Sequence, residues 1–111
     1  MAEYVQTASG VFGALTDTIA VAVPTIADAE SDVVAVDVSA ASGFAPKVGD
    51  AVIAIPLEAL PTDCILSGAY VTATDEVSVA FDTKEGGGGV TGANKNFRFL
   101  YFDCTTLSPG T

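Results

Sequence analysis

Gly87, Gly89 and Gly92 have the spacing G-x-G-x-x-G, which is found in loops that bind the pyrophosphate of a dinucleotide. Such a site needs a strand before the loop and, after it, a helix whose N-terminus faces the phosphates. Here the following run, ANKNFRFLYF (93–102), has the pattern of a strand, and Glu85 beside the loop would repel a phosphate. No Gly-Lys-Ser/Thr follows either, so the P-loop pattern is also absent. We therefore expect the glycines to form a mobile bend between two strands, because glycine is costly to order.

Carboxylates stand at alternate positions in Asp28-Ala-Glu30-Ser-Asp32, a spacing that could converge on calcium. The run lacks the glycine and the distal glutamate of an EF-hand loop, so a solvated turn is the simpler interpretation. Asp75 and Glu76 are adjacent, and adjacent side chains of a strand point to opposite faces. We therefore do not expect them to act together as an acid and a base. The sequence predicts no metal site.

The chain contains no histidine, which removes the commonest general base, the usual catalytic triads and most zinc sites. Serine and threonine lack an obvious activating base. A lysine could replace that base, but Lys47, Lys84 and Lys95 fall in predicted loops. We expect no enzyme, no catalytic residue and no cofactor. Cys64 and Cys104 are expected to be free thiols, although a disulfide would form if the chain were exported.

The formal net charge is −10 over 111 residues, only four of which are basic. A chain this acidic does not neutralise phosphates, so we expect no nucleic-acid partner. The charge would serve solubility, or it would steer the protein toward a basic surface. The first residues show neither the basic stretch nor the apolar core of a signal peptide, and no apolar run approaches the ~18 residues of a membrane span. We therefore expect no membrane partner.

Apolar side chains alternate with a period of two residues, which is typical of strands, and no helical period occurs. The alternating segments are 18–24, 33–39, 51–55, 64–73, 76–81 and 96–102. Residues 1–17 are less regular and form either an arm or an edge strand, while 106–111 form a flexible tail. We expect one domain at 18–105: an antiparallel β-sandwich or small barrel of about six to seven strands, with a jelly-roll order left open. Gly68 marks a bulge.

Alanine occupies outward positions of these strands, where a sheet facing water normally carries polar residues. These alanines are Ala20, Ala22, Ala35, Ala54, Ala69 and Ala80. In NFRFLYF both faces are apolar, with Phe97, Phe99 and Tyr101 on one side and Leu100 and Phe102 on the other. Either this strand lies at the centre of a closed sandwich or barrel, or its second face is buried against another subunit. The candidate subunit interface consists of Ala20, Ala22, Ala80, Leu100 and Phe102.

Three longer segments follow one another along the chain: TIAVAVPTIADAESDVVAVDV, then VGDAVIAIP, then SGAYVTATDEVSVAFDT. NFRFLYF comes after them, behind a glycine-rich turn. The sharpest features are Gly49-Asp50 and the V-T-A-x-D-x-V-x-V run at 71–79. Over about residues 18–102 this order resembles small virion proteins of tailed bacteriophages, of the capsid decoration (cement) and head-fibre types. Such proteins often carry an asparagine where this chain has Asp82.

The resemblance implies a non-enzymatic structural protein that binds the outer surface of an icosahedral head and stabilises it. It implies assembly in the host cytoplasm, and as partners the major capsid protein and further copies of the chain, with a homotrimer favoured. We expect residues 1–17 to be an arm that orders on docking. Its candidate contact residues are Glu3, Tyr4, Val5, Val11, Phe12 and Leu15. A tail or fibre module that recognises a host receptor, or a free-standing β-sandwich binding module, are the alternatives.

Overall fold

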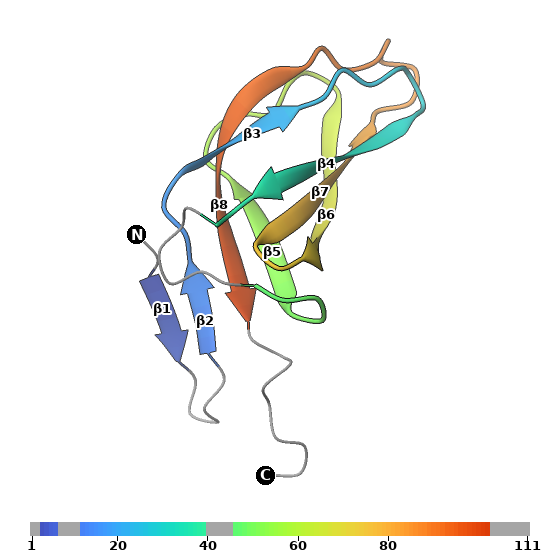
Figure 1. The fold of residues 1–111 in the computed structure, drawn as a ribbon. Helices are drawn as coiled ribbons and strands as arrows, with labels where there is room; N and C mark the ends of the chain where they lie inside the picture. Colours follow the sequence, from blue (N-terminus) through green and yellow to red (C-terminus); the bar gives the residue numbers. More distant parts are fainter. Residues whose placement is uncertain (1–2, 7–11, 40–45, 103–111) are drawn as a thin grey trace.

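The computed structural model describes residues 3–6, 12–39 and 46–102 of the chain, with the backbone alone for residues 3–6, 12 and 13 (Figure 1). The described residues form eight β-strands and no helix, which confirms the predicted all-β class. The strands are β1 (Glu3–Gln6), β2 (Phe12–Leu15), β3 (Ile19–Val23), β4 (Ser31–Asp37), β5 (Ala51–Pro56), β6 (Cys64–Ala73), β7 (Glu76–Thr83) and β8 (Ala93–Phe102).

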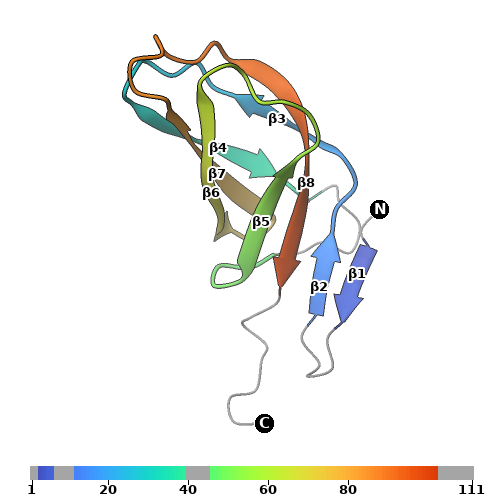
Figure 2. The same ribbon diagram turned by 180° about the vertical axis from the view of Figure 1, so that it is seen from behind.

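The strands form two antiparallel sheets that pack on each other as a sandwich (Figures 1 and 2). In the five-stranded sheet, β8 is the central strand: β5 pairs with one of its edges, β2 and β3 share the other, and β1 pairs with β2. The three-stranded sheet has the order β4-β7-β6. Every described pair in the five-stranded sheet except β1 with β2 therefore involves β8, the last described strand.

All six segments predicted as strands are strands, and the count rises to eight because residues 3–6 and 12–15 also pair. The alternation of Val77, Val79 and Phe81 toward the interior is confirmed, since all three side chains are fully buried. Residues 1–17, which the sequence assigned to either an arm or an edge strand, thus contribute β1 and β2 to one sheet. Their pattern is weak because each is only four residues long.

β2 and β3 follow one another along the same edge of β8, with one extra residue between them. Leu15 lies opposite Leu100, but Ile19 lies opposite Phe97, so the register shifts by one residue at the break. Thr16 fills this break: its amide donates to the Phe99 carbonyl (2.9 Å), and the Phe99 amide donates to Thr16 Oγ1 (3.0 Å). The Thr16 side chain is fully buried, so its hydroxyl replaces a ladder hydrogen bond that the shifted backbone cannot make.

Side chains from the inner faces of both sheets fill the core. The ring of Phe97 stacks on Phe99 (centroids 6.2 Å apart) and meets Phe81 of the other sheet edge-on at 6.3 Å. Burying each such side chain stabilises the fold by about 1.5–3 kcal/mol. The buried apolar residues are Ala14, Val21, Val23, Ile26, Val36, Val38, Ala54, Val77, Val79, Phe81, Val90, Phe97 and Phe99.

The predicted bulge in β6 is confirmed. Leu66 lies opposite Phe81 and Gly68 opposite Ala80, so Ser67 is the extra residue. A one-residue shift exchanges the two faces of a strand. Leu66 before the bulge and Ala69 after it therefore both pack against the core.

Two of the alanines predicted to face outward do not. Ala54 is buried in the core, and Ala69 is partly buried against it. The bulge at Ser67 explains Ala69. Both faces of AVIAI are apolar, so alternation alone does not show which of its residues face the core. In the structure Val52 and Ala54 face inward and Ile53 faces outward.

Candidate interaction surfaces

The glycine-rich loop between β7 and β8 is held against the turn between β3 and β4. Ile26 and Val90 exchange two backbone hydrogen bonds (3.0 and 2.8 Å), and both side chains are buried. The amides of Gly86 and Gly92 donate to Asp28 Oδ1 (3.0 Å) and Thr25 Oγ1 (2.9 Å). The predicted bend between two strands is confirmed, and these contacts offset part of the cost of ordering glycine. The expected mobility of the bend stays a prediction.

The same hydrogen bonds bear on the nucleotide-binding pattern. A phosphate loop offers its amides to the ligand, whereas here the Gly86 amide already binds a carboxylate of the chain itself. A strand, β8, follows the loop, as the sequence predicted, so no helix N-terminus faces it. Gly89 is needed for the close approach of the loop, because a Cβ there would lie 2.6 Å from the Ile26 carbonyl oxygen.

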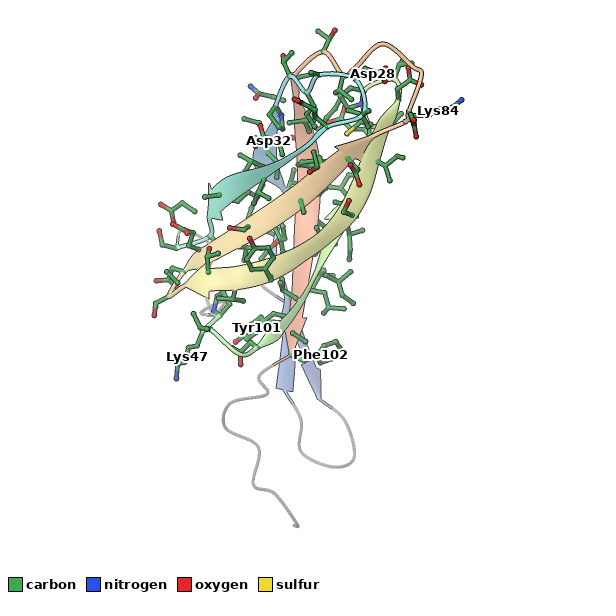
Figure 3. All side chains as sticks on the ribbon, turned by 90° about the vertical axis from the view of Figure 1, so that its right-hand side faces the viewer. Asp28, Asp32, Lys47, Lys84, Tyr101 and Phe102 are labelled. Carbon is green, nitrogen blue, oxygen red and sulfur yellow. The ribbon has the colours of Figure 1, made fainter. Side chains whose placement is uncertain are left out.

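The acidic run at 28–32 is a turn that enters β4, and each of its outer carboxylates has a local role. Asp28 binds the glycine-rich loop, and Asp32 Oδ1 accepts the Val33 amide (2.8 Å). Figure 3 shows Asp28 near Lys84 at this end of the sandwich, with Asp32 at the start of β4. Among the described residues, no group of three or more His, Cys, Asp or Glu side chains could hold a metal ion.

Asp75 and Glu76 line one open pocket of about 360 Å³, together with Asp37, Ser39 and Thr74. The argument that the two carboxylates point to opposite faces of a strand does not apply, because Asp75 lies in the turn before β7 (φ 61°). Glu76 Oε1 accepts the Thr72 hydroxyl (2.7 Å). Hydrogen bonds from the Ser39 side chain and amide lower the pKa of Asp37.

The candidate arm residues divide between two neighbouring strands of the five-stranded sheet. Glu3, Tyr4 and Val5 lie in β1, and Phe12 and Leu15 lie in β2. Val11 lies outside the described residues. β1 forms the edge of the sheet and pairs with β2 alone in the described part of the chain.

The structure does not bring the five candidate interface residues together. Ala80 lies on the outer face of the three-stranded sheet, whereas the other four belong to the five-stranded sheet. Within that sheet, Ala20 and Ala22 lie opposite Asn96 and Asn94, near one end of β8. Leu100 and Phe102 lie at its other end.

Leu100 and Phe102 belong to a larger set that alternation alone did not reveal. Register places Leu15 and Ile53 on either side of Leu100 and Ile55 beside Arg98, all on the outer face. The Ile53 side chain is 51% exposed, and the others are partly exposed. We call Leu15, Ile53, Ile55, Leu100 and Phe102 the apolar strip. Pairing of β2 and β5 with β8 creates it, so no single segment carries its signal.

The outer face of the three-stranded sheet has acidic residues at both ends. One row consists of Val33, Ala80 and Gly68, and the next of Ala35, Ser78 and Tyr70. Val33 is 48% exposed and Tyr70 50%, while Ser78 is almost fully covered although it faces outward. The rows beyond these contain Asp82 at one end and Asp37 with Glu76 at the other.

Cys64 is a free thiol that is partly buried against the core, and this desolvation raises its pKa. Cys104 and the tail at 106–111 lie outside the described residues.

Lys84 follows β7 and Lys47 lies in the loop before β5, as predicted, but Lys95 lies within β8, with its Nζ 3.9 Å from Glu58 Oε1. The described part of the chain contains no helix that could span a membrane.

Comparison of the chain with protein-family models, curated protein sequences and solved structures found no match.

Proposed function

We propose that this protein is a non-enzymatic virion component that binds the outer surface of a bacteriophage capsid and stabilises the shell. The resemblance over residues 18–102 carries the proposal. These residues correspond to β3 through β8, which form the whole three-stranded sheet and most of the five-stranded one. The resemblance therefore spans six of the eight described strands.

The two sharpest motifs of the resemblance are neighbours in space, which supports reading them as one signature. Gly49 has a φ of 103°, and Asp50 Oδ2 accepts the Lys47 amide (2.9 Å) in the turn that leads into β5. The Asp75 amide, from the V-T-A-x-D-x-V-x-V run, donates to the Pro46 carbonyl (3.3 Å) at the start of the same turn. The motifs thus meet where the turn before β5 contacts the turn between β6 and β7.

The outer faces favour a protein that packs against other proteins. Val33, Ile53 and Tyr70 are each about half exposed although they lie within strands. Contiguous apolar surface is typical of interaction sites, and Ile53 belongs to such a surface, the apolar strip. On a symmetric shell many weak contacts add up, and a protein that binds the intact shell in preference to its separated subunits stabilises it by mass action.

The charge of the chain is compatible with a position outside the shell. With a net charge of −10, the protein would be repelled by packaged DNA. Its partners under this proposal are the major capsid protein and further copies of itself, assembled in the host cytoplasm.

Immunoelectron microscopy tests the location directly. Particles from the source lysate are labelled with an antibody to this protein, and we expect label spread evenly over the heads. Label confined to tails or fibres would replace the proposal with host recognition, and particles without label would replace it with a free-standing binding module.

The N-terminal candidate residues belong to the same proposal, but they need a careful truncation. Ala14 and Thr16 are buried in the fold, so removal of residues 1–17 would damage the core as well as any contact. Removal of residues 1–6 deletes β1 and keeps both. We expect this variant to retain its far-UV circular dichroism and to lose binding to heads; unchanged binding would exclude β1 from the contact.

A further inference from the structure

β4 is the described edge strand whose shape best suits the addition of a further strand (Figure 3). Among the described strands it pairs with β7 alone, over its full seven residues and without a register shift. The other described edges are less suitable: two register shifts interrupt β6, β1 is only four residues long, Pro24 follows β3 and Pro56 ends β5. A regular, exposed, valine-rich edge is a template for pairing with another chain.

The register shows which amides of β4 point away from β7. The Val38 amide donates to the Asp75 carbonyl (2.9 Å), and residues that bond to the partner strand alternate along an antiparallel pair. The amides of the even-numbered residues of β4 therefore face β7. Those of Val33, Ala35 and Asp37 point to the free edge, where an added strand would use them as donors.

Carboxylates of β4 itself bind donors at both ends of this edge. Asp32 Oδ1 accepts the Val33 amide (2.8 Å), and Asp37 Oδ1 accepts the Ser39 amide (2.9 Å) just beyond the strand. Hydrogen bonds from the Ser39 side chain and amide lower the pKa of Asp37, which favours its charged form. Between these two contacts, the described edge offers an added strand only the amides of Ala35 and Asp37.

The same carboxylates would oppose a second copy. In an antiparallel pair of two β4 strands centred on Ala35, Asp37 of each copy would lie opposite Val33 of the other. The Val33 amide would then have to leave Asp32 in both copies, and carboxylates of the two copies would approach one another. The three strands of this sheet contain no lysine or arginine that could neutralise them.

We propose that Asp32 and Asp37 prevent an extended strand of another copy from adding to the β4 edge of the three-stranded sheet. The inference concerns the isolated protein and does not rest on the proposed function. In the wild type, the Ala35 amide should exchange its hydrogen at a rate that does not depend on protein concentration. Without the two carboxylates, the β4 edges of two copies should pair and join their three-stranded sheets into one.

Three double variants separate the role of the acceptor from that of the charge. Asp32→Ala with Asp37→Ala removes both carboxylates, whereas Asp32→Asn with Asp37→Asn removes the same charge and keeps an oxygen acceptor at each position. Asp82→Ala with Glu85→Ala changes the net charge equally, on the central strand β7 and in the loop after it. All four positions are exposed, so the variants should fold, which far-UV circular dichroism checks.

Sedimentation velocity over a range of protein concentrations, at about 0.15 M salt to screen the net charge, measures association. Amide hydrogen exchange followed by NMR locates it. We expect the double alanine variant of Asp32 and Asp37 to associate about tenfold more strongly than wild type, because pairing no longer breaks a hydrogen bond in each copy. Exchange of its Ala35 amide should slow as it associates. The asparagine variant and the variant of Asp82 and Glu85 should remain close to wild type.

Several results would overturn the inference. They are an alanine variant that associates no more strongly than the variant of Asp82 and Glu85, association that leaves Ala35 exchange unchanged, and equal association of the alanine and asparagine variants. The exchange measurement on the wild type needs no substitution, and slower Ala35 exchange at high wild-type concentration would refute the inference by itself. The labelling of heads is independent of all these results, so the proposed function and this inference can fail separately.

Discussion

The docking of the glycine-rich loop can be tested with two neighbouring substitutions. Gly88 and Gly89 have nearly the same backbone conformation, with φ of 89° and 94°. A Cβ on Gly88 would meet nothing within 4 Å, whereas a Cβ on Gly89 would lie 2.6 Å from the Ile26 carbonyl oxygen and 3.2 Å from the Asp28 amide nitrogen. Gly88→Ala therefore measures backbone strain, and Gly89→Ala measures the same strain together with the close approach.

The magnitudes follow from these contacts. A positive φ costs a residue with a Cβ about 1–2 kcal/mol, and alanine recovers about 0.4–1 kcal/mol by restricting the unfolded chain. Gly88→Ala should therefore destabilise by about 1 kcal/mol or less. In Gly89→Ala the backbone must move away from the carbonyl that accepts the Val90 amide, which breaks the Ile26–Val90 pair. Two lost hydrogen bonds add about 1–3 kcal/mol, for a total of about 1–4 kcal/mol.

Urea unfolding followed by far-UV circular dichroism gives both free energies, and thermal unfolding should show a decrease in Tm of about 4 °C for each kcal/mol in a domain of this size. Equal effects of the two substitutions would show that the close approach does not matter. If both variants matched the wild type within about 0.5 kcal/mol, the loop would be mobile as the sequence alone predicted, and the docking argument would fail.

Three further predictions concern single side chains. Thr16→Val should lower the free energy of unfolding by about 1–3 kcal/mol, because it leaves the buried Phe99 amide without its acceptor. Thr16→Ser keeps the hydroxyl and should retain most of this stability in the same urea titrations. If Thr16→Ser were equally damaging, the effect would lie in the lost methyl group. Asp37 has a lowered pKa in the folded state, so its small stabilisation is present above its unfolded value of 3.8 and is lost as pH falls through the folded value. The difference in stability between wild type and Asp37→Asn should therefore shrink from pH 6 to pH 3, and a constant difference would contradict the assignment. Burial raises the pKa of Cys64. In a Cys104→Ser background, its reaction with a thiol reagent should therefore be slower than in the urea-unfolded chain and should accelerate only above pH 9. The stability that favours the neutral thiol is lost as pH rises through the folded pKa, and equal rates in folded and unfolded protein would contradict the burial.

The strands were accessible from the sequence because valine and phenylalanine alternate with small or polar residues over most of their length. Val77, Val79 and Phe81 illustrate this, since local alternation alone placed them in the core. The bulge near Gly68 was equally local. In contrast, the inward position of Ala54 depends on its pairing with Phe99 of β8, and both faces of β5 are apolar, so no local rule could assign it.

The docked loop and the apolar strip depend on contacts between distant segments. Ile26 and Val90 are separated by most of the domain, and glycine composition alone favours mobility. The strip joins Leu15, Ile53 and Leu100 from three strands. Sequence reasoning identified Leu100 and Phe102 but grouped them with Ala80, because it could not distinguish the outer faces of two sheets.

The central position of β8 has a consequence for biosynthesis. β2, β3 and β5 each pair with this strand, and it is the last of the described strands to be translated. A ribosome adds about 5–20 residues per second, so the first strands wait several seconds without their hydrogen-bonding partner. Only β4, β6 and β7 can form their sheet before residues 93–102 emerge. Chains that terminate before residue 93 therefore lack the strand that joins this sheet, and a nascent protein has no apolar strip until residues 93–102 have emerged.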